Sequence, residues 1–170
     1  QRDRYGRIVT FTARALNSQA TVKYLNGKDC AIYKKNSSIF GIDIALKAAR
    51  QTGKVYLVEG APDVMRLQSL GIANVVASLG GSWSEEQLGC FNKFGCTLCF
   101  IPDHDVPKEG ELFGAGEKFV FRNGRLATEM GFQVSVREIP SDKGQKQDAD
   151  SYIINLERWD SLSEKDFILW

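Results

Sequence analysis

Histidine is nearly lacking from this sequence: His104 is the only one in 170 residues, which also include four cysteines. A tetrahedral zinc site would therefore need cysteines that lie far apart in the chain. Cys96 and Cys99 form a C-x-x-C pair, but they fall within an apolar segment and no second pair follows. We expect no zinc in these residues, and buried thiols at all four cysteines, Cys30 and Cys90 included.

Long apolar runs are missing as well. None approaches the roughly 20 residues of a membrane-spanning helix, and no signal or transit peptide opens the sequence. The cysteines fit no disulfide framework in a chain of this length without an export signal. We therefore expect a cytoplasmic protein with no membrane contact. Because the first residue is Gln1 rather than Met, we also expect a piece of a longer protein.

The net charge of +1 conceals a marked asymmetry. Residues 1–54 carry eleven Lys and Arg against three Asp and Glu, whereas the remaining residues carry eleven against eighteen. Such a split favours phosphate binding by the first third and cation binding by the rest. The alternative is two solvated faces with no special partner.

After residue 53 the chain alternates between strand and helix patterns. We expect strands at 55–58, 74–79, 97–101 and 132–139. We expect helices from Pro62, from the capping box Ser84–Gln87, over 115–130 and over 150–160. This order predicts the α/β class, with a mostly parallel central sheet flanked by helices in a domain at 51–170.

Residues 1–50 have a different character. A strand pattern at 6–14 is followed by short basic and aromatic pieces at 23–26 and 32–35, then by a helix pattern at 40–50. We expect a small basic α+β segment ahead of the larger domain. Residues 141–147 are polar and are expected to form a loop.

Acidic side chains follow the predicted strands where each strand ends. They are Glu59 and Asp63, Asp103 and Asp105, and Asp148 and Asp150. Because the carboxyl ends of parallel strands share one edge of a sheet, the three pairs should converge. Crowded carboxylates repel one another, and a hard divalent cation bound by oxygen ligands relieves that repulsion. The pattern favours a Mg²⁺ or Mn²⁺ site for phosphoryl chemistry on nucleic acid.

Each pair also has a structural explanation. Asp63 can complement a helix dipole, the segment 103–105 can form a turn, and Asp148 can cap a helix. Three coincident pairs at one predicted edge favour the metal site over three separate structural roles. Asp63 is the weakest member, because its place at a helix start explains it almost as well.

The spacing Glu59-Gly-Ala-Pro-Asp63, followed by Asp103-His-Asp105, resembles the Toprim signature of primases, topoisomerases, recombination-repair proteins and some nucleases. Upstream and downstream segments resemble bacterial DnaG-type primases more narrowly: Gly6-Arg7, Thr12-Ala-Arg14, Lys23-Tyr-Leu-Asn26, Lys35, Phe40-Gly41, Val76-Ala-Ser-Leu-Gly80 and Asp148-Ala-Asp150. Together these cover nearly the whole chain. The resemblance implies a Toprim-like sheet within a fragment of a primase catalytic core.

The resemblance also implies roles for individual residues. Glu59, Asp103 and Asp105 would be catalytic, with Glu59 as general base or inner metal ligand. Two Mg²⁺ or Mn²⁺ ions would be held by these three with Asp63, Asp148 and Asp150. Contacts to nucleotide or template would come from Arg14, Lys23, Tyr24, Asn26 and Lys35. The implied activity is synthesis of RNA primers from ribonucleoside triphosphates on single-stranded DNA. A replicative helicase is an implied partner, through regions outside this sequence.

Two departures from the primase pattern stand beside the match. Residues 106–113 intervene between Asp105 and Gly114-Ala-Gly116, where the family has a direct turn; the insertion either lengthens the approach or reshapes access to the metals. Ala61-Pro62 is an unusual pair at the two variable positions of the first motif. A Toprim nuclease and a catalytically silent nucleic-acid-binding Toprim module are the alternatives. The basic segment favours a primase over a nuclease, and the intact acids argue against the silent module.

Overall fold

The computed structural model describes residues 1–17, 19, 21–22, 24–140 and 146–170. A five-stranded sheet forms its centre, in the order β4-β3-β5-β6-β7. The strands are β3 (Lys54–Val58), β4 (Val75–Ala77), β5 (Thr97–Phe100), β6 (Val134–Arg137) and β7 (Glu164–Asp166). The first four pair in parallel and β7 pairs antiparallel with β6. The predicted mostly parallel sheet is confirmed.

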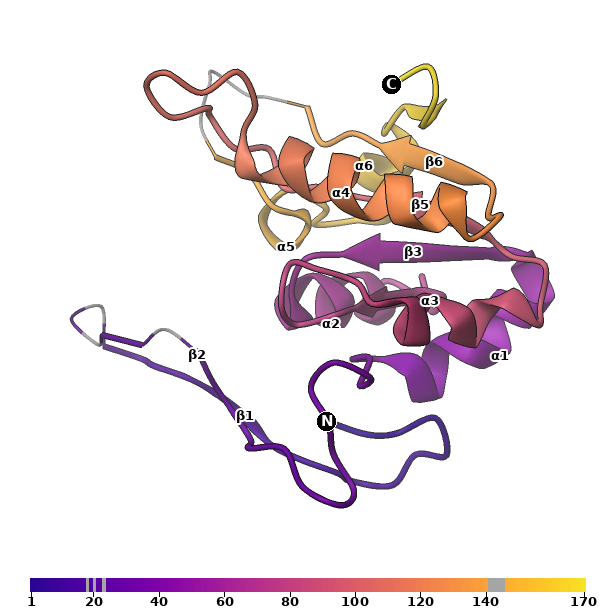
Figure 1. Ribbon diagram of the computed structural model, residues 1–170. Coiled ribbons are helices and arrows are strands. Elements are labelled where there is room, and N and C mark those ends of the chain that lie inside the picture. The colour runs from indigo at the N-terminus through magenta and orange to yellow at the C-terminus, as the bar shows by residue number, and fades with distance from the viewer. Residues whose placement is uncertain (18, 20, 23, 141–145) are drawn as a thin grey trace.

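Helices cover both faces of this sheet. One core includes residues of α1 (Ile42–Thr52), α3 (Glu85–Asn92) and α4 (Ala115–Glu129); the other includes residues of α2 (Ala61–Ser69) and α5 (Ala149–Tyr152), with Trp159 of α6 (Leu156–Asp160). Successive side chains of a strand point to opposite faces, so Val55 and Leu57 of β3 enter the first core and Val58 enters the second. Figure 1 shows α4 in front of β5 and β6, with α6 behind them.

The order of the strands places a crevice at the centre of the sheet. From β3 the chain runs through α2 to β4 on one side, then through α3 to β5 on the other side of β3. The connections from β3 through α2 and from β4 through α3 thus lie on opposite faces of the sheet and leave a gap at the carboxyl ends of β3 and β5. Ligands bind at this position in open α/β sheets. The arrowhead of β3 in Figure 1 points to this edge, where α5 also lies.

The N-terminal segment forms a separate two-stranded ribbon of β1 (Thr12–Arg14) and β2 (Tyr24–Asn26), which projects from the body in Figure 1. The predicted strand at 6–14 was too long. Residues 3–7 instead form a turn, in which Asp3 Oδ1 accepts hydrogen bonds from the backbone amides of Tyr5 and Arg7. The predicted connecting helix is confirmed as α1, two residues later than expected.

The single closing helix predicted over 150–160 was wrong. The chain leaves the helix at Ile153, which is fully buried, and Asn155 starts α6 by accepting a hydrogen bond from Arg158 N at 2.9 Å. This break lets Ile153 and Trp159 enter the same core. Strand β7 was not predicted, because its residues Glu164-Lys-Asp166 lack the β-branched and aromatic side chains typical of strands.

The Asn123-Gly124 pair inside α4 has a packing reason. Asn123 is fully buried; its Oδ1 accepts from Trp83 N at 2.9 Å and its Nδ2 donates to Phe119 O at 2.8 Å. A Cβ at Gly124 would lie 2.7 Å from the ring of Phe167. Two residues of low helix propensity therefore stand inside α4 because they allow it to pack against Trp83 and Phe167.

Burial divides the cysteines. Cys96 and Cys99 are buried as expected, and burial raises the pKa of Cys99 to about 12. Cys30 is exposed and Cys90 is half-buried, so the expectation of buried thiols was wrong for Cys30. Among the described residues, each helix is too short or too polar to cross a bilayer.

Candidate metal centre

Two neighbouring strand ends bring three carboxylates together. Glu59 directly follows β3, while Asp103 and Asp105 follow β5, which pairs with β3 in parallel. The backbone amide of Asp103 donates to Glu59 Oε1 at 3.2 Å, which ties the two ends to each other. One oxygen from each of the three side chains lies within 4.8 Å of the others. We call Glu59, Asp103 and Asp105 the acidic triad.

Two glycines dock α4 against the segment that carries Asp103 and Asp105. A Cβ at Gly116 would lie 1.9 Å from Asp103 O, and one at Gly114 would lie 2.3 Å from Asp105 O. Only glycine permits so close an approach of helix and loop. The insertion at 106–113 therefore leaves and returns without displacing α4. Pro107 and Leu112 of the insertion help line a cavity of about 410 Å³ beside Asp103 and Asp105.

Burial raises the pKa of two members of the triad, Asp103 and Glu59. It raises the pKa of Asp103 to about 8, with the negative charge of Glu59 as the next cause. Burial also raises the pKa of Glu59, and the hydrogen bond from Asp103 N offsets this only in part. Carboxyl groups held in this state bind a proton or a metal cation more readily than solvated ones.

One oxygen in the triad lacks a protein partner. Asp105 Oδ2 is buried and has no hydrogen-bond partner among the described residues, although Asp105 Oδ1 contacts Lys146. An unsatisfied buried carboxylate oxygen is costly unless a cation satisfies it. Oxygens that share one Mg²⁺ ion lie at most about 4.2 Å apart, twice the usual Mg–O distance. The triad oxygens, all within 4.8 Å of one another, lie close to that limit, so these residues fit a divalent cation.

Asp63 faces the backbone instead of the triad. Its Oδ2 accepts from Gly60 N at 3.0 Å, which caps α2, and its Oδ1 accepts from Asp150 N at 3.0 Å. Burial raises the pKa of Asp63, although both hydrogen bonds oppose the shift. Asp150 in turn pairs with Arg66, whose Nε lies 3.0 Å from its Oδ1. The geometry thus explains both acids through local structure.

Asp148 also has a structural role. It caps α5, where its Oδ1 accepts from Ser151 N at 2.8 Å. Burial alone would raise the pKa of Asp148, but the hydrogen bonds from Ser151 outweigh it and lower the pKa. Of the six acids predicted to converge, the structure groups Glu59, Asp103 and Asp105, whereas Asp63, Asp148 and Asp150 form a second layer bound to backbone and arginine.

A lysine that was not predicted for this site, Lys146, contacts the triad. Lys146 Nζ lies 2.7 Å from Asp105 Oδ1 and 3.6 Å from Asp103 Oδ2. The hydrogen bond to Asp105 raises the pKa of Lys146, so the ammonium keeps its charge. The only signal in the sequence was a lysine two residues before Asp148, within a segment expected to be a polar loop.

Three of the predicted nucleotide contacts, Arg14, Tyr24 and Asn26, lie on the ribbon. The Arg14 guanidinium stands over the Tyr24 ring, 5.6 Å from its centroid. Both residues line a cavity of about 610 Å³ between the ribbon and α2, whose described lining includes Asp150 but not the triad. Asn26 has a structural contact, because its Oδ1 accepts from Thr12 Oγ1 at 3.0 Å.

Lys35 lies nearer the sheet edge. A Cβ built on Gly80, in the loop after β4, would lie 3.9 Å from Lys35 Nζ. Because β4 is the neighbour of β3, this places the ammonium at the carboxyl edge that also carries Glu59. Lys23, the remaining predicted contact, lies outside the described residues.

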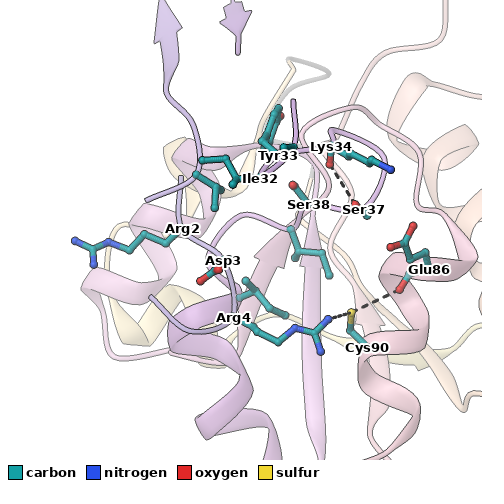
Figure 2. A pocket seen from close by; sticks show the side chains of 14 residues that line it. Arg2, Asp3, Arg4, Ile32, Tyr33, Lys34, Ser37, Ser38, Glu86 and Cys90 are labelled. Carbon is teal, nitrogen blue, oxygen red and sulfur yellow. Dashed lines mark hydrogen bonds between the residues drawn. The ribbon is translucent and has the colours of Figure 1, made fainter. Parts of the chain in front are cut away.

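A further hollow of about 270 Å³, with several basic residues in its lining, lies between the N-terminal turn and α3. Figure 2 shows Arg2 and Lys34 pointing away from each other, while Arg4 reaches Cys90, with its Nη2 3.5 Å from the sulfur. Since these cations diverge, the hollow does not form a single charged centre.

Comparison with known proteins fits this architecture. Residues 2–46 match the family "DNA primase catalytic core, N-terminal domain", and residues 56–153 match the Toprim-like family. A DNA primase of Staphylococcus aureus is 30% identical over 148 residues, which are 87% of this chain and 22% of that protein. This chain thus spans about a fifth of that relative.

Solved structures show the same fold. The zinc-binding and RNA polymerase domains of Aquifex aeolicus primase align with a TM-score of 0.78 at 28% identity, over 96% of this chain and 39% of that one. A DnaG primase catalytic domain bound to single-stranded DNA aligns with a TM-score of 0.72 at 24% identity, over 99% and 52%. The chain therefore belongs to the Toprim-like family, and it carries the N-terminal and Toprim domains of the DnaG primase catalytic core.

Proposed function

We propose that this chain catalyses metal-assisted nucleotidyl transfer, making RNA primers on single-stranded DNA from ribonucleoside triphosphates. The observation that carries the proposal is the acidic triad with its unsatisfied Asp105 Oδ2, set at the crevice of a primase catalytic core. The DnaG catalytic domain with the same fold is bound to single-stranded DNA, which supports the choice of template.

In this proposal the triad holds Mg²⁺ or Mn²⁺, two ions in the full site. Bound divalent ions activate a hydroxyl and stabilise the charge on the leaving oxygens. Asp103 and Asp105 are the principal ligands. Glu59 acts as ligand or general base, and its raised pKa makes its carboxylate a stronger base than a solvated one. Asp63, Asp148 and Asp150 hold the surrounding backbone and complete an outer acidic shell.

The basic segment supplies the contacts to phosphate and base. Arg14, Lys23 and Lys35 neutralise the triphosphate or the template backbone, and Tyr24 and Asn26 contact a base or a sugar. We assign residues 1–50 to this role and residues 51–170 to the metal centre. The protein would work in the cytoplasm, and a replicative helicase would be reached through regions outside this sequence.

Incorporation of labelled ribonucleotides on single-stranded DNA tests the proposal. With Mg²⁺ or Mn²⁺, Glu59→Gln and Asp103→Asn should each lower incorporation by about 100-fold or more. Asp160→Asn, the same change at an exposed acid of α6, is the matched control and should retain activity. Unchanged incorporation in both triad variants would exclude the triad as the catalytic centre.

A further inference from the structure

Lys146 places a positive charge directly against the acidic triad. Its ammonium contacts two of the three members, Asp105 at 2.7 Å and Asp103 at 3.6 Å. The two aspartate side chains are only about 15% exposed, so their charges are poorly screened by water. A single lysine therefore offsets part of the charge repulsion between these acids.

Backbone hydrogen bonds fix the residue in this place. Gln147 N donates to His104 O at 2.9 Å, and His104 N donates to Gln147 O at 2.7 Å. This isolated bridge joins the residue after Lys146 to the residue between Asp103 and Asp105. The Cα of Lys146 is thus held close to the aspartates, whereas its side chain is 61% exposed and can move into solvent without disturbing the core.

A lysine ammonium and a divalent cation compete for the same two side chains. Both need the carboxylates of Asp103 and Asp105, and two cations at short distance from one oxygen repel each other. We propose that Lys146 is a built-in counter-cation of the triad: it contacts Asp103 and Asp105 in the metal-free protein, must leave them when a divalent ion binds, and so weakens metal binding. The inference rests on the proposed metal site and adds a residue that sets its affinity.

The test is a Mn²⁺ titration of the 170-residue chain, with free Mn²⁺ followed by electron paramagnetic resonance. Lys146→Gln should bind Mn²⁺ about five- to tenfold more tightly than the wild type, because two partly exposed ion pairs no longer oppose the metal. Lys146→Arg, which keeps the charge, should bind no more tightly than the wild type. Without metal, Lys146→Gln should unfold at a lower temperature, and saturating Mn²⁺ should close that gap.

Lys54→Gln is the matched control. Lys54 also pairs with a carboxylate, Glu164 at 2.6 Å, but it begins β3 at the end of the strand opposite Glu59. The Lys54→Gln variant loses the same charge as Lys146→Gln, and its Mn²⁺ affinity should stay within about twofold of the wild type. If Lys146→Gln binds Mn²⁺ no more tightly than the wild type while Glu59→Gln abolishes binding, the role proposed for Lys146 is overturned and the metal site stands. No binding by wild type or Lys146→Gln would overturn both the inference and the metal site.

Discussion

The contact between α4 and the loop after β5 can be tested by a single methyl group. In Gly116→Ala the new Cβ would lie 1.9 Å from Asp103 O, whereas ordinary contacts begin at 3.4 Å. The helix or the loop must therefore shift by about 1.5 Å, the difference between these distances. Overpacking of this kind costs roughly 1–3 kcal/mol, against which alanine's helix propensity returns at most about 1 kcal/mol.

Because the clash is with a backbone oxygen, we expect a net loss of about 2 kcal/mol, the upper end of this balance, and a fall in Tm of roughly 4–8 °C, measured by calorimetry. Affinity for Mn²⁺ should fall as well, because the shift separates Asp103 from Glu59. Gly89→Ala is the control: that glycine lies inside α3 with no described atom within 4 Å of an added Cβ, so the change should leave Tm unchanged or raise it. A Gly116→Ala protein with wild-type Tm and Mn²⁺ affinity would refute the argument from close approach.

Three further predictions concern single groups. Asp63→Ala should lower stability by roughly 1–2 kcal/mol, since a helix cap is lost. It should lower Mn²⁺ affinity less than Asp103→Ala does; a larger loss of affinity in Asp63→Ala would show that Asp63 is a metal ligand. The pKa of Asp103 is raised from 3.8 to about 8, so the folded chain binds more protons than the unfolded one between these values. Metal-free stability should therefore decrease as pH rises from 5 to 9 in EDTA, and Asp103→Asn should flatten that slope; a wild-type Tm that rises over this range would contradict the assignment. In the native protein a thiol reagent should modify Cys30 quickly and Cys99 only on unfolding, and rapid modification of Cys99 would show that its strand is not buried.

The features that were predictable from the sequence depend on local pattern. The apolar run before Glu59 and the run before Asp103 both form buried parallel strands. The Ser84–Gln87 capping box is present as predicted, with both hydrogen bonds formed. Once the strands are parallel neighbours, their acidic ends must meet, which is why the core of the site could be derived.

The features that were missed depend on contacts between distant segments. Besides capping α2, Asp63 accepts a hydrogen bond from the backbone of Asp150, 87 residues away, and this second partner could not be inferred from spacing. Lys146 reaches the triad only because a two-bond bridge joins Gln147 to His104, and no periodicity marks that bridge. Asn155 was a usable signal for the start of α6, but the apolar pattern on either side of it favoured one continuous helix.

The central claim is that Glu59, Asp103 and Asp105 bind the divalent ion used in nucleotidyl transfer. Anomalous diffraction from a crystal of this chain soaked in Mn²⁺ tests it most directly. We predict a manganese peak within bonding distance of carboxylate oxygens from at least two triad members, with Lys146 displaced from Asp105. Manganese found only elsewhere, with the Lys146–Asp105 pair intact at saturating metal, would contradict the account.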